Sequence, residues 1–481
     1  MWLTVSLSVQ SPPMSRTLVF RFAHTLTRFF ERFLPDAFGF ALAALLLAAA
    51  LGWLWGGANF STLAKGFGQG FFSLLAFTLQ MSLMLILGHA IAGARSVSRL
   101  LAALSGLPKT AHGAVVWVGF LAMLTSWLNW AFSLLFSGLL AQAVARRFAR
   151  QRRRVDYKAL AAASFLGLGS IWAQGLSGSA ALQMASKESL PPGLAGKVIP
   201  LSQTIFLWQS LVSVAVEVIV ISALLWWIAP REAESLTAAD LGLSFPERDD
   251  TEPNAETEAE ASCPRPGDVL ERSRLLTLPL LLLGGGFLWQ TIGQAPSKLA
   301  AVSLNAINLT LLLVATLLHK TPMRLQRAFG QATPAVAGLL LQFPFYGGIA
   351  GMLAATGLSE RIASLFVGVA NRATLPPLVA LYSAFLGVFV PSGGSKWLIE
   401  APYVLAAAER LHVHPGWMVA TYDLGEALAN LVQPFWMLPL LGPFRLKARD
   451  VMGYTTMVFL VLCPLVLFLT YVLGQTLLPA Q

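Results

Sequence analysis

The sequence predicts an all-α integral membrane protein with about 9–11 transmembrane helices, arranged as two inverted repeats that each hold a re-entrant hairpin and a broken helix. The first observation is composition. Of 481 residues, 56% are hydrophobic and 12% are charged, which is about half the charge density of a soluble domain. The second is that the apolar residues gather in stretches long enough to cross about 30 Å of hydrocarbon. The third is that most basic residues stand in short runs between those stretches.

Eleven apolar stretches are candidate spans, because a crossing helix needs about 20 apolar residues. They are 37–57, 71–93, 112–145, 159–185, 203–229, 274–293, 299–318, 332–356, 375–408, 415–441 and 453–474. Before them, arginines and phenylalanines interleave in residues 1–33. This pattern predicts an amphipathic cytoplasmic segment on the inner leaflet rather than a cleaved signal peptide.

The basic loops set the orientation by the positive-inside rule. Loops 94–111 and 146–158 both carry basic clusters, so both ends of 112–145 are expected in the cytoplasm. That overlong stretch is predicted to enter and return as a hairpin that turns near Asn129. The same alternation places both ends of 375–408 outside, as a second hairpin. We expect a multi-pass protein of the cell inner (plasma) membrane, with a cytoplasmic N-terminus and a periplasmic C-terminus.

An acidic linker divides the chain into two apolar halves. Twelve of the 23 acidic residues lie between Glu232 and Glu271, and we interpret 230–273 as a cytoplasmic linker between a repeat at 34–229 and a repeat at 274–481. A constant offset of 262 relates Gln80 to Gln342 and Arg99 to Arg361, and it supports the repeat weakly. The linker is expected to be a solvated tether. A regulatory contact with the basic inner loops is the alternative.

Several function classes lose support from the sequence. The net charge is +10, but the basic residues do not interleave with aromatics in a polar segment, so we expect no nucleic-acid partner. The motifs of ATP-driven pumps, zinc hydrolases and serine hydrolases are missing, and the six histidines are dispersed. The two cysteines lie in different settings and predict neither a disulfide nor a metal cluster. We therefore expect no enzyme, no cofactor and no metal.

Four stretches are predicted to break helices at membrane depth, where irregular backbone must line a cavity or be buried in protein. The first is Asn129, the proposed tip of hairpin one, for which a packing asparagine is the alternative. The second, 174–179, has free amides and hydroxyls that suit an ion, unless it is a small-residue packing motif. The third, 390–397, joins a helix start to Lys396 and suits a carboxylate, unless it is a plain extracellular loop.

The fourth break, 423–430, holds a carboxylate that costs roughly 2.5–3.5 kcal/mol to insert. Glu426 is a candidate for exchanging a proton or helping to bind sodium, and Asn430 lies four residues beyond it on the same helix face. A structural ion pair with Lys396 is the alternative. Glu400 follows Lys396 by one turn and is expected to balance it. Glu217 lies outside the repeated core, and we favour a structural role for it.

At these stretches the chain resembles the short-chain fatty acid transporter family. The matching motifs, which run in order along nearly the whole chain, are Phe33-Leu34-Pro35-Asp36, Leu128-Asn129-Trp130, Gly175-Leu176-Ser177-Gly178-Ser179, Leu318-His319-Lys320-Thr321-Pro322-Met323, Gln342-Phe343-Pro344-Phe345-Tyr346-Gly347-Gly348-Ile349, Val390-Pro391-Ser392-Gly393-Gly394 and Asn430-Leu431-Val432-Gln433-Pro434-Phe435-Trp436. The chain departs from the family where Ser395-Lys396-Trp397 replaces Gly-His-Trp and where Glu400 replaces a glutamine. Ala427 also replaces a polar residue.

The resemblance implies an ion-coupled carrier with inverted repeats and two re-entrant hairpins. We expect a secondary active transporter that moves short-chain fatty acids and small monocarboxylates such as acetoacetate and butyrate, by proton or sodium symport. The expected partners are that carboxylate, the coupling ion and the lipid bilayer, with a homodimer left open. The candidate substrate-binding residues are Asn129, Ser177, Gly178, Ser179, Gln342, Ser392, Gly393, Gly394, Ser395, Lys396 and Asn430, and the candidate ion-coupling residues are Glu426 and Glu400. The alternatives are a carrier of other anions such as dicarboxylates, an integral membrane enzyme and a channel.

Overall fold

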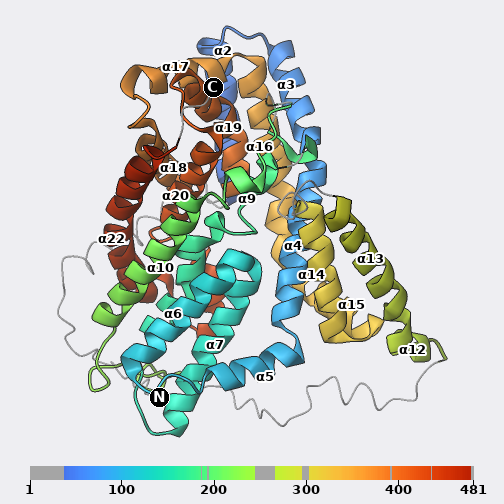
Figure 1. Cartoon of the computed structure of the whole chain (residues 1–481), viewed down its shortest axis with the longest axis vertical. Coiled ribbons are helices and arrows are strands. Elements are labelled where there is room, and N and C mark those ends of the chain that lie inside the picture. Colours follow the sequence, from blue (N-terminus) through green and yellow to red (C-terminus); the bar gives the residue numbers. More distant parts are fainter. Residues whose placement is uncertain are drawn as a thin grey trace, which may run out of the picture.

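The computed structural model describes residues 37–185, 187–191, 194, 196–243, 266–294, 303–389, 393–434 and 436–477. Within these ranges the regular structure is helical (Figure 1). The predicted amphipathic segment 1–33, the motif at 33–36, the middle of the linker at 244–265 and the residues Val390, Pro391 and Ser392 lie outside the described residues.

The described residues of the first half form nine α-helices and a broken stretch. They are α2 (Ala37–Leu54), α3 (Phe60–Ser73), α4 (Leu75–Ala92), α5 (Arg95–Leu104), α6 (Ala111–Leu128), α7 (Trp130–Arg150), α8 (Tyr157–Leu166), α9 (Ser179–Met184) and α10 (Trp208–Ile228). Between α8 and α9 the chain passes through a π-helical turn, η1 (Gly167–Ile171), and a 3-10 turn, η2 (Trp172–Gln174).

The second half begins with the short helix α12. Its helices are α12 (Pro266–Glu271), α13 (Leu278–Gln294), α14 (Leu304–His319), α15 (Pro322–Ala332), α16 (Ala337–Ala355), α17 (Leu358–Val369), α18 (Leu375–Phe389), α19 (Gly393–Arg410), α20 (Pro415–Ala429), α21 (Met437–Phe444) and α22 (Ala448–Gly474). The 3-10 turns η5 (Arg274–Thr277) and η6 (Thr333–Val336) lead into α13 and α16.

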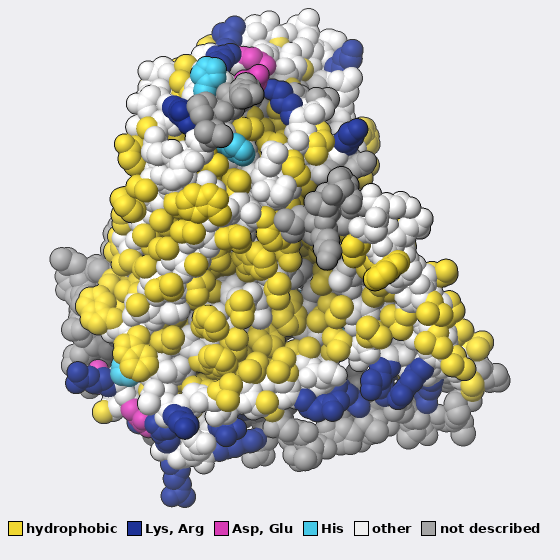
Figure 2. Space-filling view, in the orientation of Figure 1, with side chains coloured by type: hydrophobic (Ala, Val, Ile, Leu, Met, Phe, Trp, Pro, Cys, Tyr) yellow, Lys and Arg dark blue, Asp and Glu magenta, His cyan; other side chains and the backbone are white. Residues whose placement is uncertain are grey.

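Seven helical stretches among the described residues are long and apolar enough to cross a membrane. Exposed leucines, tryptophans and phenylalanines lie along them, and Figure 2 shows a broad apolar face across the middle of the molecule. Charged side chains gather toward its two ends. This distribution suits a protein whose middle contacts lipid and whose ends contact water.

Four helices were not predicted as separate elements. Helix α3 directly precedes α4, and α5, α15 and α17 lie in segments interpreted as loops. The last three have 10, 11 and 12 residues, which is too short for a span, and each has polar residues along one face. Hydropathy averaged over the length of a membrane span therefore does not detect them. Their amphipathic pattern, with apolar residues on one face, is the feature of the sequence that predicts them.

Both overlong stretches contain a helix pair. In the first, α6 ends at Leu128 and α7 begins at Trp130, so Asn129 alone is extended at the turn. The Asn129 side chain caps α7 by accepting a hydrogen bond of 2.8 Å from the backbone N–H of Phe132. The paired helices are held by a 3.0 Å hydrogen bond from Thr125 to Ser133. The predicted turn at Asn129 is confirmed.

Helices α3 and α16 meet through glycines, which we call the glycine seam (Gly66, Gly70, Gly347 and Gly351). A Cβ atom placed on Gly66 would lie 2.9 Å from the carbonyl oxygen of Gly351. One placed on Gly347 would lie 2.6 Å from the carbonyl oxygen of Gly70. Glycines spaced by four on both helices thus let the two backbones touch, as in small-residue packing of membrane helices.

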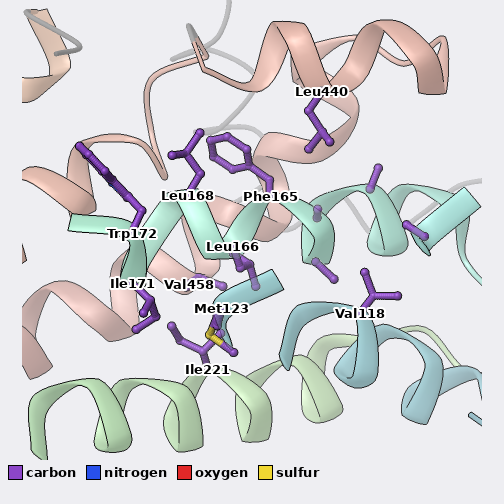
Figure 3. Packing of buried hydrophobic residues seen from close by; sticks show 14 of the residues in the cluster. Val118, Met123, Phe165, Leu166, Leu168, Ile171, Trp172, Ile221, Leu440 and Val458 are labelled. Atoms are coloured by element: carbon purple, nitrogen blue, oxygen red, sulfur yellow. The ribbon is translucent and has the colours of Figure 1, made fainter. Parts of the chain in front are cut away.

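The main core surrounds the broken stretch between α8 and α9. Phe165, Leu166, Leu168 and Ile171 pack against Met123 of α6 and against α10, α21 and α22 (Figure 3). Residues 157–174 are almost entirely buried. A helix that departs from α geometry is tolerated here because neighbouring helices, rather than lipid, surround it.

The basic loops contact one another at one end of the molecule, where α5, α12 and α15 also lie (Figure 1). Arg153 donates to the Lys109 carbonyl oxygen at 2.6 Å, and Lys158 pairs with Asp450 at 2.7 Å. The loops assigned to the cytoplasm therefore share a side, as the charge pattern predicts.

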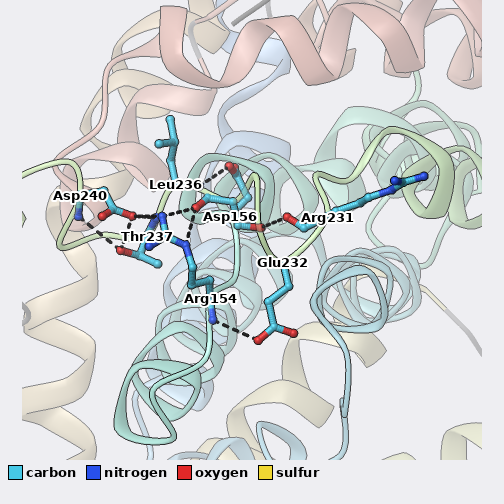
Figure 4. A network of polar contacts seen from close by, with 8 residues as sticks. Arg154, Asp156, Arg231, Glu232, Leu236, Thr237 and Asp240 are labelled. Atoms are coloured by element: carbon cyan, nitrogen blue, oxygen red, sulfur yellow. Dashed lines mark hydrogen bonds and ion pairs between the residues drawn. The ribbon is translucent and has the colours of Figure 1, made fainter. Parts of the chain in front are cut away.

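The first part of the linker is packed rather than a free tether. Arg153 pairs with Glu232 at 2.8 Å. Arg154 pairs with Asp240 at 2.7 Å, and Figure 4 shows the polar network around Arg154 and Asp156. The Asp156 carboxylate accepts the Leu236 N–H at 3.0 Å. Burial raises the pKa of Asp156, although hydrogen bonds from backbone N–H groups partly oppose this. The tether prediction is therefore wrong for residues 231–240.

Candidate functional site

The break between α8 and α9 lies against the tip of the first hairpin. The Ser177 hydroxyl accepts the Trp130 N–H at 2.9 Å, and the Leu176 N–H donates to the Trp127 carbonyl oxygen at 2.7 Å. A Cβ atom on Gly175 would overlap the Trp127 backbone, so this close approach requires glycine. The sequence motif 175–179 is therefore the partner of the hairpin tip.

The start of α19, at the tip of the second helix pair, reaches the same region from the other half. The carbonyl oxygen of Gly394 accepts a 2.8 Å hydrogen bond from Gln183 of α9. A Cβ atom on Gly394 would lie 2.9 Å from the Cβ of Ser179. The carbonyl oxygen of Gly393 accepts the Tyr422 hydroxyl at 2.5 Å. The two breaks therefore meet through α9 and α20.

A buried charge cluster lies directly behind this tip. The Lys396 ammonium is 2.5 Å from a Glu426 carboxylate oxygen and 3.5 Å from a Glu400 oxygen. It also donates to the backbone carbonyl oxygen and the hydroxyl of Ser383 at 2.5 and 2.6 Å. The three charged side chains are 2% exposed or less. Charges this deep are tolerated only when they are paired and hydrogen-bonded.

The cluster has more carboxylates than cations. The Asp423 carboxylate, also buried, lies near Glu426 and accepts a backbone hydrogen bond from Ala181. Glu400 contacts the Lys396 ammonium only at 3.5 Å, which is a longer distance than that of Glu426. With every carboxylate ionised, one ammonium would face three negative charges in a low-dielectric site, which is costly without further compensation.

The second broken helix is tied to the first. Asn430 ends α20, and its amide donates to the carbonyl oxygen of Leu168 in η1 at 3.0 Å. The Asn430 oxygen accepts from Gln433 at 2.8 Å. This hydrogen bond joins the two halves of the chain at the point where both helices depart from regular geometry.

The predicted site residues separate into three groups. Ser177, Gly178, Ser179, Gly393, Gly394, Lys396, Glu400, Glu426, Asn430 and Asn129 belong to the connected region just described. Gln342 lies partly exposed on α16, and no contact among the described residues joins it to the others. Ser392 lies outside the described residues, as does the side chain of Ser395.

Several contributing residues were missed. Tyr422 and Ser383 bind the tip and the Lys396 ammonium, but no spacing in the sequence links them to Lys396. Trp172 would lie 2.8 Å from a Cβ atom on Gly393, and its indole N–H has no acceptor among the described residues. The Asn129 amide nitrogen is likewise buried without an acceptor. These two unpaired donors are suited to an anionic ligand.

A further buried acid, which lies outside the charge cluster, is Glu217 of α10. The amide of Gln174 donates to both of its oxygens at 3.0 and 3.1 Å, which ties α10 to the broken stretch and agrees with a structural role. No group of three or more histidines, cysteines, aspartates or glutamates in the described part of the chain is arranged to hold a metal ion.

Comparisons with known proteins agree on one family. The model of the short chain fatty acid transporter family matches residues 18–473. A protein of Escherichia coli (strain K12) named "Putative short-chain fatty acid transporter" is 34% identical over 91% of this chain and 96% of its own length. A Haemophilus influenzae protein of the same name is 31% identical over 92% and 97%.

Solved structures show the same fold at low identity. The Alcanivorax borkumensis YdaH transporter matches with a TM-score of 0.55 and 16% identity over 93% of this chain and all of that one. MtrF of Neisseria gonorrhoeae matches with a TM-score of 0.53 and 16% identity over 94% and 97%. The chain therefore belongs to the short-chain fatty acid transporter family and is a multi-pass membrane transporter, not an enzyme.

Proposed function

We propose that this protein is a secondary active transporter that moves short-chain monocarboxylates, such as butyrate and acetoacetate, across the bacterial inner membrane together with a proton or a sodium ion. The observation that carries the proposal is the buried cluster of Lys396, Glu426 and Glu400 at the meeting point of two broken segments. Sites between discontinuous helices from two repeats are typical of ion-coupled carriers.

The carboxylate of the substrate binds near the start of α19. The positive end of that helix and the unpaired donors of Trp172 and Asn129 suit a negative charge. A short-chain acid has one carboxylate and a small apolar tail, and the tryptophans around Gly393 provide apolar surface for the tail. Ser177 and Ser179 hold the tips in place and extend the polar lining.

The surplus of carboxylates explains the need for a coupling cation. One ammonium among three carboxylates leaves negative charge to be neutralised in a buried site. A proton or sodium ion at Glu426 or Glu400 supplies that charge. The bound cation makes the site less negative, which favours binding of the substrate carboxylate nearby.

Access requires the two tips to separate. In the described arrangement Lys396, Glu400 and Glu426 are sealed from solvent, and the tip of α19 is held on α9 by the hydrogen bond from Gln183. We infer that the halves 34–229 and 274–481 form inverted repeats and that their hairpins are re-entrant. Opening on alternate sides then exposes the cluster first to one compartment and then to the other.

Counterflow in proteoliposomes tests the proposal. We expect saturable uptake of labelled butyrate and acetoacetate, with accumulation under either an imposed pH gradient or an imposed sodium gradient. The proposal is wrong if neither acid is taken up under any ion gradient. The alternative is a dicarboxylate carrier, in which Lys396 would bind the second carboxylate of the substrate. Inhibition of butyrate uptake by succinate would favour that alternative. The contacts that Lys396 already makes with Ser383 and Glu426 disfavour that carrier.

A further inference from the structure

A cavity of about 320 Å³ opens at the basic end of the molecule, far along the chain from the charge cluster. Its lining, which we call the basic cavity, includes six cationic side chains: Arg95, Arg99, Arg274, Lys320, Arg324 and Arg327. No aspartate or glutamate is among the described residues that line it. The residues come from α4, α5, η5, the end of α14 and α15, so both halves of the chain contribute.

The walls of this cavity are fixed by contacts between those elements. The imidazole of His319 contacts the carbonyl oxygen of Ala90 at 3.0 Å and joins α14 to α4. The Thr277 hydroxyl donates to the carbonyl oxygen of Lys320 at 3.5 Å and joins η5 to α14. Helix α5 begins at the wall with Ala94 as an N-cap that provides no side-chain hydrogen bond. Its positive end therefore adds to the field of the six cations.

Lys320 contributes its ammonium from a backbone conformation that is unfavourable for a lysine. Lys320 ends α14 with a φ of 68°, in the left-handed region where helix ends favour glycine. A lysine in this conformation is less stable than a glycine by roughly 1 kcal/mol. The energetically unfavourable choice places one more ammonium in a cavity that already holds five guanidinium groups.

The surface beside the cavity is apolar. Leu275 and Leu317 are 72% and 58% exposed, and Leu100 of α5 is 49% exposed. Figure 2 shows the dark blue basic patch directly below the yellow apolar face, at the edge of the part that suits lipid. A ligand with both a phosphate and acyl chains matches this combination, whereas a free anion uses the cations alone.

We propose that the basic cavity binds the phosphate-bearing headgroup of an anionic phospholipid, with its acyl chains lying along the exposed leucines of η5 and α14. The headgroup bridges α5 of the first half and α15 of the second. Its negative charge is complementary to the positive charge that these side chains bring together at the cavity.

The test measures thermal stabilisation of the purified full-length protein in detergent on titration with phosphatidylglycerol, with phosphatidylcholine as the uncharged comparison. Phosphatidylglycerol is expected to raise the unfolding temperature and phosphatidylcholine is not. The variant Arg99→Gln/Arg327→Gln is expected to weaken the apparent affinity roughly 25-fold, because each cation near an anionic lipid contributes about a factor of five. The control Arg361→Gln/Lys65→Gln removes two exposed cations elsewhere and should change it less than about twofold.

A second variant separates binding from folding. Lys320→Gly removes one cavity cation and at the same time relieves the left-handed lysine, so the lipid-free protein should be at least as stable as the parent. Its affinity for phosphatidylglycerol should still fall about fivefold. Unchanged affinity in this variant and in Arg99→Gln/Arg327→Gln would overturn the proposal.

Two further outcomes also overturn it. Equal stabilisation by inorganic phosphate without lipid would assign the cavity to a soluble anion. Phosphatidylglycerol binding that arises only after deletion of residues 247–260 would assign the cavity to that acidic segment of this chain. Retention of phosphatidylglycerol on the parent, and its loss from Arg99→Gln/Arg327→Gln in native mass spectrometry, would support the lipid site independently.

Discussion

Replacement of Lys396 by methionine tests whether the buried ion pair is essential to the fold and to transport. At 2.5 Å from Glu426, two unit charges attract by about 7 kcal/mol at an effective dielectric constant of about 20. Desolvation offsets part of that attraction, and loss of one partner from a buried pair generally costs about 3–5 kcal/mol because the other charge stays buried alone. We expect Lys396→Met to lower the free energy of unfolding by that amount and to abolish transport.

A matched pair at the surface gives the control. Lys158 and Asp450 lie 2.7 Å apart, but their side chains are 26% and 24% exposed, so Lys158→Met should cost at most about 1 kcal/mol. Adding Glu426→Gln and Glu400→Gln to Lys396→Met should restore part of the lost stability, because both carboxylates that pair with Lys396 are then neutral, while transport stays absent. Unfolding in sodium dodecyl sulfate and uptake of labelled butyrate measure the two effects separately. If Lys396→Met costs no more than Lys158→Met, the buried pair does not form in the folded protein.

Three further predictions follow from the contacts of the site. Gly394→Ala should reduce butyrate uptake at least about tenfold, because its methyl group would lie 2.9 Å from the Cβ of Ser179 and would push the tip of α19 away. A misplacement of about 1 Å in a positioned site can lower the rate about 100-fold. Gly285→Ala, which meets open space on α13, should leave uptake unchanged, and equal effects would contradict the tip contact. Ser177→Ala should lower stability by about 1–3 kcal/mol in thermal unfolding, because the N–H that begins α7 loses its acceptor; Ser177→Thr should retain most of it. Burial lowers the pKa of His414, whose Nδ1 accepts a 3.2 Å hydrogen bond at the start of α20. The unfolded chain therefore takes up the proton first, and stability should decline as pH falls through about 6.5, by about 1 kcal/mol for one cap. His414→Asn should keep the cap without this pH dependence, and an identical decline in that variant would refute the assignment.

The sequence predicts the breaks better than the helices between them. The turn at Asn129 and the break at 174–179 follow from charge, length and glycine content, and all of these are local properties. The departure from α geometry starts earlier than expected, at Gly167, because a π-helical turn depends on how α6 and α10 pack around it. Helix α3 was missed because Lys65 and Gln69 lower its hydropathy, and the fit of its glycines at 66 and 70 to α16 depends on the packing of the two helices.

The candidate site was predicted in part for a similar reason. Lys396, Glu400 and Glu426 were found because a charge inside an apolar stretch is conspicuous in sequence. Their mutual distances depend on how α18, α19 and α20 cross, so the contribution of Ser383 to Lys396 was not accessible. Gln342 illustrates the opposite case, since a family motif singled it out but no hydrogen bond among the described residues joins it to the cluster.

The glycine seam has a mechanical consequence. Two helices that touch backbone to backbone resist sliding past each other, because only the glycines of the seam leave room for the opposite main chain. Helices α3 and α16 are thus expected to move together as one rigid body. The conformational change of transport must then occur at other contacts between helices. The best candidate is the contact between α19 and α9, where a hydrogen bond from the Gln183 side chain holds the tip.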